Sequence, residues 1–190
     1  MHVLMTGATG FIGQPLCEQL IKDGHRLTIL TRRSRGDTAM CRFVNRLDSI
    51  ASNEAFDAVI NLAGASVAET RWTAGYKREI LASRLDTTQA LLHLLQRLES
   101  RPRVLLSASA IGYYGHHGDE PLEETGEITP GFSQDLCAQW ERLALAASDM
   151  GLRVCLLRLG VVLDQGGGAF ARMALPFRLG IANWLGDGHQ

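Results

Sequence analysis

The stretch Thr6-Gly7-Ala8-Thr9-Gly10-Phe11-Ile12-Gly13 decides the fold of this 190-residue chain. It follows a short apolar run, Val3 to Thr6, and leads into a helix-period segment, Leu16 to Lys22. In such a turn the first glycine permits a tight bend, the second lets the backbone approach a diphosphate, and the third lets helix and strand pack closely. A helix N-terminus adds unpaired N–H groups and a partial positive charge. The stretch therefore predicts a βαβ unit that binds a dinucleotide.

Short apolar runs alternate with helix-period segments along the chain. The runs are nearly all apolar instead of alternating, which is typical of parallel strands covered by helices on both faces; they are Val3 to Thr6, Leu27 to Thr31, Ala58 to Ala63, Val104 to Ser109 and Val154 to Val162. The clearest helical segments are Leu16 to Lys22, Lys77 to Glu99 and Asp135 to Ala147. The expected fold class is α/β, a doubly wound parallel sheet of the Rossmann type, with the start of a smaller C-terminal substrate lobe.

Three glycines, Gly166 to Gly168, interrupt this pattern after the last expected strand. We expect the dinucleotide-binding domain to occupy residues 1–163 and a substrate-binding lobe to begin in residues 164–190. The chain stops in a polar turn, Gly186 to Gln190, without a closing element. For this reason we expect the sequence to be a fragment.

Composition narrows the set of partners. Lys and Arg total 19 against 20 Asp and Glu, so no net field attracts nucleic acid. No targeting segment or run of membrane-spanning length is present, so a cytoplasmic protein without a membrane partner is expected. The four cysteines are scattered without zinc-site spacing and are expected to be buried free thiols.

The second expected strand ends in Thr31-Arg32-Arg33, with no carboxylate before Asp37. Proteins that bind NAD usually place an acidic residue here, on the ribose 2′-hydroxyl. An arginine instead suits a 2′-phosphate, because its guanidinium makes charge-assisted hydrogen bonds. Arg32 therefore favours NADP(H). A solvated basic loop is the alternative, since Arg35 extends the run.

Two further strand ends carry candidate site residues. Leu62-Ala63-Gly64 offers small side chains where the adenosine half of a cofactor would lie. Ser107-Ala108-Ser109 is followed by Tyr113-Tyr114, so Ser109, Tyr113 and Tyr114 are the candidate catalytic residues near a nicotinamide. A serine in a strand-end turn is also common for local hydrogen bonding, and both interpretations of Ser109 stay open. The neighbouring His116-His117 are expected to be exposed loop residues, without a metal.

Together these motifs resemble the extended short-chain dehydrogenase/reductases, the NAD(P)-dependent epimerase/dehydratase-like proteins. Further motifs narrow the resemblance to an atypical epimerase-like branch; they are Arg71-Trp72-Thr73, Ser83-Arg84 with Thr87, Trp140-Glu141 and Pro176-Phe177-Arg178. The resemblance implies an NADP(H) cofactor held by the glycine turn, Thr31-Arg32, Leu62-Ala63, Glu79, Arg84 and Val162. The residues alone would place Glu79 and Arg84 on a solvated helix face. The resemblance also implies a small-molecule substrate of unknown identity and allows a homodimer through helices Lys77 to Glu99 and Asp135 to Ala147.

One family feature is missing. Its enzymes usually carry Tyr-x-x-x-Lys on the helix after the fifth strand, where the lysine lowers the pKa of the tyrosine. A register on Leu136 puts Gly131 and Asp135 at these two positions, and no lysine follows Lys77. Two functions remain open: an NADP(H)-dependent oxidoreductase or epimerase-like enzyme that uses other groups, and a non-catalytic NADP(H)-binding regulator or scaffold.

Overall fold

The computed structural model describes residues 1–33, 35–68 and 70–164, together with 167, 168, 170, 174, 176, 180 and 181. The chain forms two compact units, Met1–Leu159 and Gly160–Gln190. The second contains a short strand, β7 (Leu163–Asp164), bridged antiparallel to Gly167 and Gly168. Most of the expected start of a substrate lobe, 164–190, lies outside the described residues.

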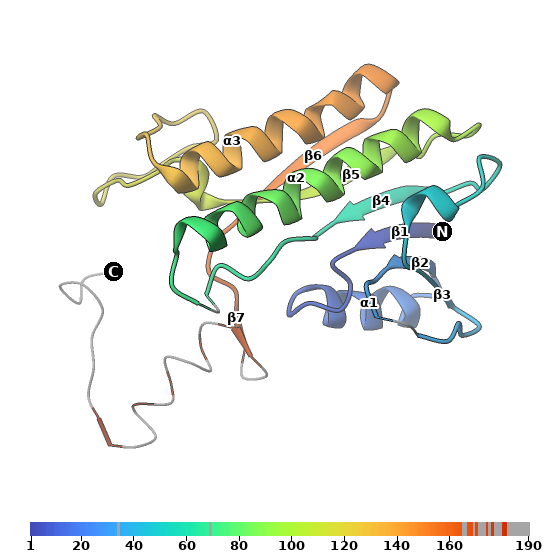
Figure 1. Ribbon diagram of the computed structural model, residues 1–190, viewed down its shortest axis with the longest axis horizontal. Coiled ribbons are helices and arrows are strands. Elements are labelled where there is room, and N and C mark those ends of the chain that lie inside the picture. The colour runs from blue at the N-terminus through green and yellow to red at the C-terminus, as the bar shows by residue number, and fades with distance from the viewer. Residues whose placement is uncertain are drawn as a thin grey trace. The chain divides into compact units, whose positions relative to one another are not determined.

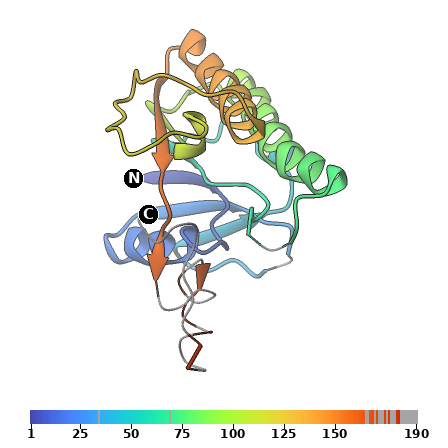
Figure 2. The same cartoon turned by 90° about the vertical axis from the view of Figure 1, so that its left-hand side faces the viewer.

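The first unit is built on a six-stranded sheet in the order β3-β2-β1-β4-β5-β6, with every neighbouring pair parallel. Its strands are β1 (His2–Thr6), β2 (Arg26–Leu30), β3 (Cys41–Val44), β4 (Ala58–Asn61), β5 (Val104–Ala110) and β6 (Arg153–Leu159). Helices α2 (Ala74–Arg97) and α3 (Phe132–Leu145) lie side by side on one face, and α1 (Gly13–Lys22) covers the other (Figures 1 and 2). The doubly wound α/β fold expected from the sequence is confirmed. Across the described part of the chain, no helix is long and apolar enough to cross a membrane.

Element boundaries differ from the sequence expectation where local capping decides them. The helix expected from Lys77 begins at Ala74, because the Thr73 side chain caps it by accepting the Tyr76 N–H. The last strand ends at Leu159 instead of Val162, just before Gly160. Strand β3 was not among the expected runs, since Arg42 interrupts its four residues.

Two hydrophobic clusters fill the two faces of the sheet. Successive strand residues point to opposite faces, so Leu4 packs under α2 and α3 whereas Val3 and Met5 pack against α1. On α2, Leu92 and Leu95 are buried against the sheet. Helices thus cover both faces of the sheet. The amino ends and the carboxyl ends of its strands, the amino edge and the carboxyl edge, remain for polar groups.

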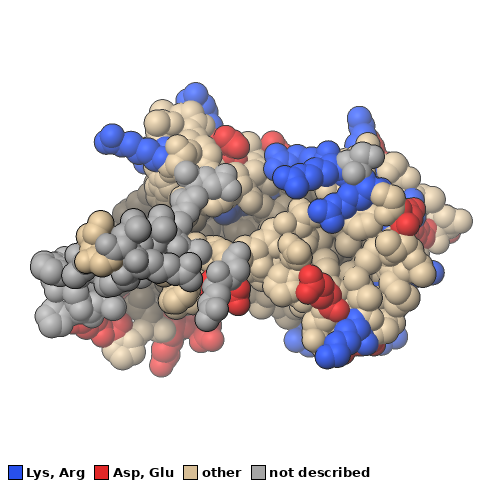
Figure 3. All heavy atoms as spheres, turned by 90° about the horizontal axis from the view of Figure 1, so that it is seen from below, with Lys and Arg blue, Asp and Glu red and all other residues tan. Residues whose placement is uncertain are grey.

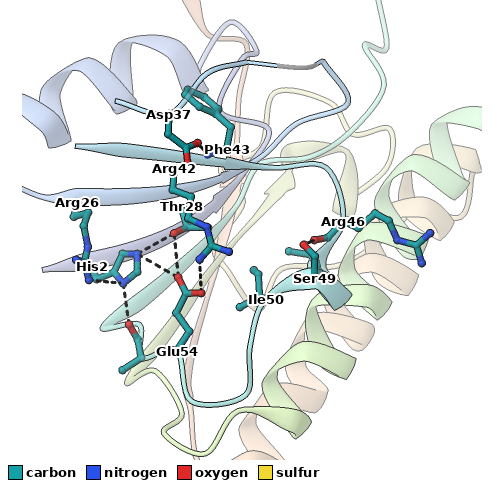
Figure 4. Close-up of polar contacts among 12 residues, drawn as sticks. His2, Arg26, Thr28, Asp37, Arg42, Phe43, Arg46, Ser49, Ile50 and Glu54 are labelled. Carbon is teal, nitrogen blue, oxygen red and sulfur yellow. Dashed lines mark hydrogen bonds and ion pairs between the residues drawn. The ribbon is translucent and has the colours of Figure 1, made fainter. Parts of the chain in front are cut away.

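At the amino edge of the strands, polar side chains satisfy one another (Figure 4). The Nε2 atom of His2 lies 2.9 Å from the Thr28 hydroxyl oxygen, and Thr28 donates to Glu54 at 3.5 Å. Arg42 forms an ion pair with the same carboxylate at 2.6 Å. Burial, aided by the nearby Arg26, lowers the pKa of His2. This cluster connects β1, β2 and β3 with the segment that precedes β4.

The lowered pKa of His2 gives the first prediction. The folded protein keeps this ring neutral, so its contribution to stability is complete above the ordinary histidine pKa of about 6.5 and is lost as the pH falls through the lowered value. Denaturant unfolding from pH 8 to pH 5 should show a loss of stability in the wild type that is smaller in His2→Gln. His93→Gln, at an exposed site on α2, is the control. Identical pH profiles for wild type and His2→Gln would contradict this role.

Candidate cofactor site and catalytic edge

The glycine turn joins β1 to α1 through close backbone contacts. Gly7 has a φ of +69°, and a Cβ on it would lie 2.4 Å from the Leu62 carbonyl. A Cβ on Gly13 would lie 2.2 Å from the Gly7 oxygen. At Gly10 a Cβ would meet only the Gly7 oxygen, at 3.2 Å. Gly7 and Gly13 are thus required by packing, whereas the space over Gly10 is open for a ligand.

The start of α1 adds positive potential to this turn. The Gly10 N–H donates to the Gly7 oxygen at 3.0 Å, which shapes the bend. The helix cap, Ile12, makes no side-chain hydrogen bond, and the first turn carries no acidic residue. Thr9 is exposed and Phe11 is half-buried. The unpaired N–H groups and the partial positive charge of this helix start suit an anion such as a diphosphate.

Arg32 lies directly beyond the end of β2. The preceding Thr31 is buried, with its N–H bonded to the Val44 oxygen at 2.9 Å, and its hydroxyl accepts the Arg33 N–H at 3.2 Å. Arg32 is exposed, and no described carboxylate forms an ion pair with it. Figure 3 shows Lys and Arg side chains at several places on the face seen there, along its upper rim and at its lower right, with Asp and Glu side chains along the lower rim and between them. Backbone hydrogen bonds thus hold this turn, and the turn exposes the Arg32 guanidinium to solvent.

A cavity of about 430 Å³ opens between the end of β2, the segment after β3 and helix α2. Leu30 lines it next to Thr31, and Asn45 and Thr87 line it from the other two elements. Sequence reasoning did not assign Asn45, because it follows the strand that the apolar pattern missed. The cavity provides concave space at the end of β2.

Buried polar groups fix the strand ends under the site. The Thr6 hydroxyl donates to Asn61 at 2.7 Å, and the Asn61 amide donates to Thr88 at 2.9 Å. The Trp140 indole N–H also donates to Thr88, at 3.1 Å, and the Ala63 N–H donates to Thr6 at 3.3 Å. The network joins β1, β4, α2 and α3, so the loop at Ala63 keeps its place above the sheet.

Helix α2 holds the next part of this loop. Ser83 accepts the Ala65 N–H at 2.8 Å, and Arg84 donates to the Ala65 oxygen at 3.2 Å. A Cβ on Gly64 would lie 2.8 Å from the Arg84 guanidinium carbon. Burial lowers the pKa of Arg84, and within the described residues it has no carboxylate partner. A side chain at Gly64 would push the Arg84 guanidinium out of this position. The uncompensated cation favours an anionic ligand nearby.

Two other residues that the resemblance implied lie in different surroundings. Glu79 is exposed on α2. Val162 belongs to the second unit and is 40% exposed. Their roles stay predictions.

The end of β5 brings three polar side chains together. Ser109, 3% exposed, donates to Glu141 on α3 at 2.5 Å. Arg158 on β6 donates to both carboxylate oxygens of Glu141, each at 2.9 Å. Glu141 is 5% exposed. Sequence reasoning noted Glu141 only as part of a motif and missed Arg158, whose signal is a charge inside the apolar run of β6.

The two tyrosines after β5 surround the same arginine. The Arg158 guanidinium carbon lies 3.5 Å from the ring centroid of Tyr113 and 5.1 Å from that of Tyr114. It also donates to the Tyr114 phenol oxygen at 2.9 Å. Hydrogen bonding to Glu141 raises the pKa of Arg158, so the cation is permanent. Tyr114 is 8% exposed, and Arg158 holds its phenol as Glu141 holds the Ser109 hydroxyl.

The face of α3 toward this edge carries Ser133 and Cys137. A Cβ on Gly112 would lie 3.1 Å from Ser133 Cβ and 3.8 Å from Cys137 Sγ. Gly131, at the position expected for the tyrosine, precedes the helix, and Asp135, at the position expected for the lysine, is exposed. Burial raises the pKa of Cys137, so its thiol keeps its proton. The helix face nearest the strand end therefore has neither a tyrosine nor a lysine.

The segment 115–131 folds back beside this edge through His117. The side chain of His117 is 13% exposed, with Nδ1 2.8 Å from a Glu120 oxygen and Nε2 2.9 Å from the Tyr114 carbonyl oxygen. Both ring nitrogens face acceptors, and the Glu120 hydrogen bond raises the pKa of His117. The expectation of exposure is wrong for His117, because the chain turns back over it, whereas His116 is exposed. No described group of three or more His, Cys, Asp or Glu side chains could hold a metal ion.

The second prediction follows from this raised pKa. The stabilising contacts of charged His117 are present below its ordinary pKa and are lost as the pH rises through the raised one. Hydrogen exchange at the Thr129 N–H, which donates to the Tyr114 oxygen at 2.7 Å, should quicken over this range after correction for the intrinsic rate. In His117→Gln it should be fast throughout, and His116→Gln is the control. Unchanged protection in His117→Gln would exclude the role.

The sequence matches the model of the NAD-dependent epimerase/dehydratase family over residues 3–176. The chain belongs to this family. It is 39% identical to an epimerase family protein of Staphylococcus saprophyticus over 193 aligned residues, which cover 100% of the chain and 64% of that relative. Family members of this kind therefore extend well beyond the part described above.

Solved structures agree with this assignment. A human epimerase family protein crystallised with NADPH superposes with a TM-score of 0.86 at 33% identity, over 100% of this chain and 64% of that one. A nucleoside-diphosphate sugar epimerase from Corynebacterium glutamicum gives a TM-score of 0.80 at 32% identity, over 99% of this chain and 39% of that one. The resemblance to epimerase-like short-chain dehydrogenase/reductases is confirmed.

Proposed function

We propose that this chain is the NADP(H)-binding part of an epimerase-like oxidoreductase that acts on a small molecule. The observation that carries the proposal is the open space over Gly10 at an uncapped helix start, with Arg32 at the end of β2 where a carboxylate would select NAD. The human relative, 33% identical and crystallised with NADPH, supports the choice of NADP(H).

Each part of the cofactor has a group that fits it. Backbone N–H groups at the start of α1 would bind the diphosphate, and the Arg32 guanidinium would bind the 2′-phosphate. The cavity lined by Leu30, Asn45 and Thr87 offers space for the adenosine half. The other residues expected to contact the cofactor keep that proposed role. They are Gly7, Thr9, Phe11, Ile12 and Gly13 of the turn, Leu62, Ala63 and Gly64 after β4, and Glu79 and Arg84 on α2. The bound nicotinamide would supply or accept a hydride, and Ser109 would orient the reacting oxygen of the substrate.

A regulator without turnover is the second candidate. It is favoured by the α3 face toward the edge, where Ser133 and Cys137 supply neither a tyrosine acid nor a lysine. Assays of the full-length protein with sugar nucleotides separate the two. Turnover at typical enzyme rates, roughly 1–10³ per second, that is lost in Ser109→Ala would reject the regulator. Mass spectrometry of co-purifying ligands would identify the substrate class.

The third prediction concerns cofactor choice. NADPH should bind more tightly than NADH, and Arg32→Asp should weaken NADPH binding by about tenfold to a hundredfold, the range for lost hydrogen bonds between charged groups. Arg142→Asp makes the same charge change at an exposed position on α3 and should leave the preference intact. Fluorescence titration measures all six affinities, those of the three proteins for the two cofactors. Equal affinity of the wild type for NADPH and NADH would reject the assignment of Arg32.

The fourth prediction separates ligand space from packing space in the turn. Gly10→Val should fold, because only the Gly7 oxygen lies near the new Cβ and Gly10 has no positive φ. It should nevertheless lose NADPH binding, since the side chain occupies the space of the diphosphate. Gly7→Val is the contrasting variant and should fail to fold. A folded Gly10→Val protein that binds NADPH as the wild type does would place the cofactor elsewhere.

A further inference from the structure

We propose that a second cavity, at the amino edge of β1, β2 and β3, binds a small organic carboxylate through the guanidinium of Arg26. The cavity has a volume of about 450 Å³ and is lined by Arg26, by Thr28 on β2 and by the turn that leads into β3, Thr38 to Cys41. The proposed cofactor site lies at the opposite ends of the strands. The carboxylate site therefore goes beyond the proposed function and does not depend on it.

The charged side chains that line this cavity leave one arginine without a counter-ion. They are Arg26, Arg42 and Glu54. Arg42 and Glu54 form an ion pair at 2.6 Å, so each neutralises the other (Figure 4). Arg26 is exposed and forms no ion pair with any described carboxylate. One positive charge thus remains in the lining, and a single carboxylate would balance it.

Within the described residues, the one side chain that Arg26 contacts is a poor acceptor for its N–H groups. The Nη2 atom of Arg26 lies 3.2 Å from Nδ1 of His2. The same Nδ1 lies 2.9 Å from the Ala55 carbonyl oxygen, which can only accept, so Nδ1 carries a proton and donates it there. A ring nitrogen in this state has no lone pair for a guanidinium. The Arg26 N–H groups are therefore left for water or for an oxygen of a ligand.

The charge and the shape of the lining favour a monocarboxylate. A guanidinium binds the two oxygens of a planar carboxylate in a bidentate arrangement. Ala39 and Met40 also line the cavity and offer apolar contact to a short hydrocarbon chain. A phosphate dianion would bring a second negative charge toward Glu54 and toward Asp57, whose carboxylate accepts the His2 backbone N–H at 2.6 Å.

Arg26 also influences the charge of the neighbouring His2 ring. Burial is the first cause of the lowered pKa of His2, and the charge of Arg26 on β2 is the second. From the segment before β4, the carboxylates of Glu54 and Asp57 act in the opposite direction. An anion bound to Arg26 would offset its charge, so the pKa of His2 should rise when the site is occupied.

The hydrogen bonds around His2 accommodate the protonated ring. Its Nδ1–H donates to the Ala55 oxygen, and a second proton on Nε2 would face the Thr28 hydroxyl oxygen at 2.9 Å. The Thr28 hydroxyl donates in turn to Glu54 at 3.5 Å. Ligand binding and protonation of His2 are therefore coupled, and the carboxylate should bind more tightly below the pKa of His2 than above it.

NMR of the complete chain without an N-terminal tag tests the site, with propionate as the probe. Propionate should shift the imidazole signals of His2 and move their titration midpoint to higher pH, whereas the exposed His116 should respond no more than it does to sodium chloride at the same ionic strength. Propionamide, which has a similar shape without the charge, should have no effect. In Arg26→Gln, the His2 midpoint should be higher even without ligand, and the affinity for propionate should fall by about tenfold or more, the range for a lost hydrogen bond to a charged group.

Arg103→Gln is the matched control, because it removes an exposed arginine just before β5, outside the cavity. It should bind propionate as the wild type does. Equal responses of the wild type to propionate and propionamide, or an unchanged response to propionate in Arg26→Gln, would overturn the proposal. Tighter binding of inorganic phosphate than of propionate would overturn the choice of a carboxylate.

Discussion

The backbone contact between the glycine turn and the end of β4 is the constraint on which the rest of the site depends. Gly7 adopts a left-handed conformation directly against the Leu62 carbonyl, and Gly13 lies directly against Gly7. No side chain fits between these segments. The contact sets the start of α1 next to the β4 loop, and the Thr6–Asn61–Thr88 network under it holds both strand ends. The space proposed for the cofactor therefore depends on the close approach of β1, β4 and α1 at glycines, which carry no side chain.

Charged side chains lie at both ends of the strands, and some of them are paired with carboxylates. At the amino edge, Arg42 is paired with Glu54 and His2 is bonded to Thr28. At the carboxyl edge, Arg32 has no described carboxylate partner. The half-buried Arg84 also lacks one among the described residues and donates to backbone oxygens beside the Trp140 ring. Desolvated cations without counter-ions are costly unless a ligand supplies the negative charge. Arg84, the desolvated one of the two, therefore favours an anionic ligand at the carboxyl ends of the strands.

Local sequence signals predicted the features that are themselves local. The glycine turn, the parallel strands and the absence of a Tyr-x-x-x-Lys pair could all be recognised within a few residues of one another. The Ser109–Glu141–Arg158 cluster could not, because its members are up to 49 positions apart along the chain and meet only through the pairing of β5 with β6 and the rotation of α3. In the sequence, Arg158 is only a charged residue within an apolar strand, and the fold identifies Glu141 as its partner.

We expect a nicotinamide dinucleotide to bind at the carboxyl ends of the strands, along the glycine turn. Backbone amide NMR spectra of the chain during titration with NADPH test this most directly. The largest chemical-shift changes should fall in Gly7–Gly13, Thr31–Arg33 and Leu62–Ala65. The amide signals of Arg26 and Asp57, at the amino ends of the strands, should not shift. Shifts centred on the amino edge, or a spectrum unchanged at saturating NADPH, would contradict it.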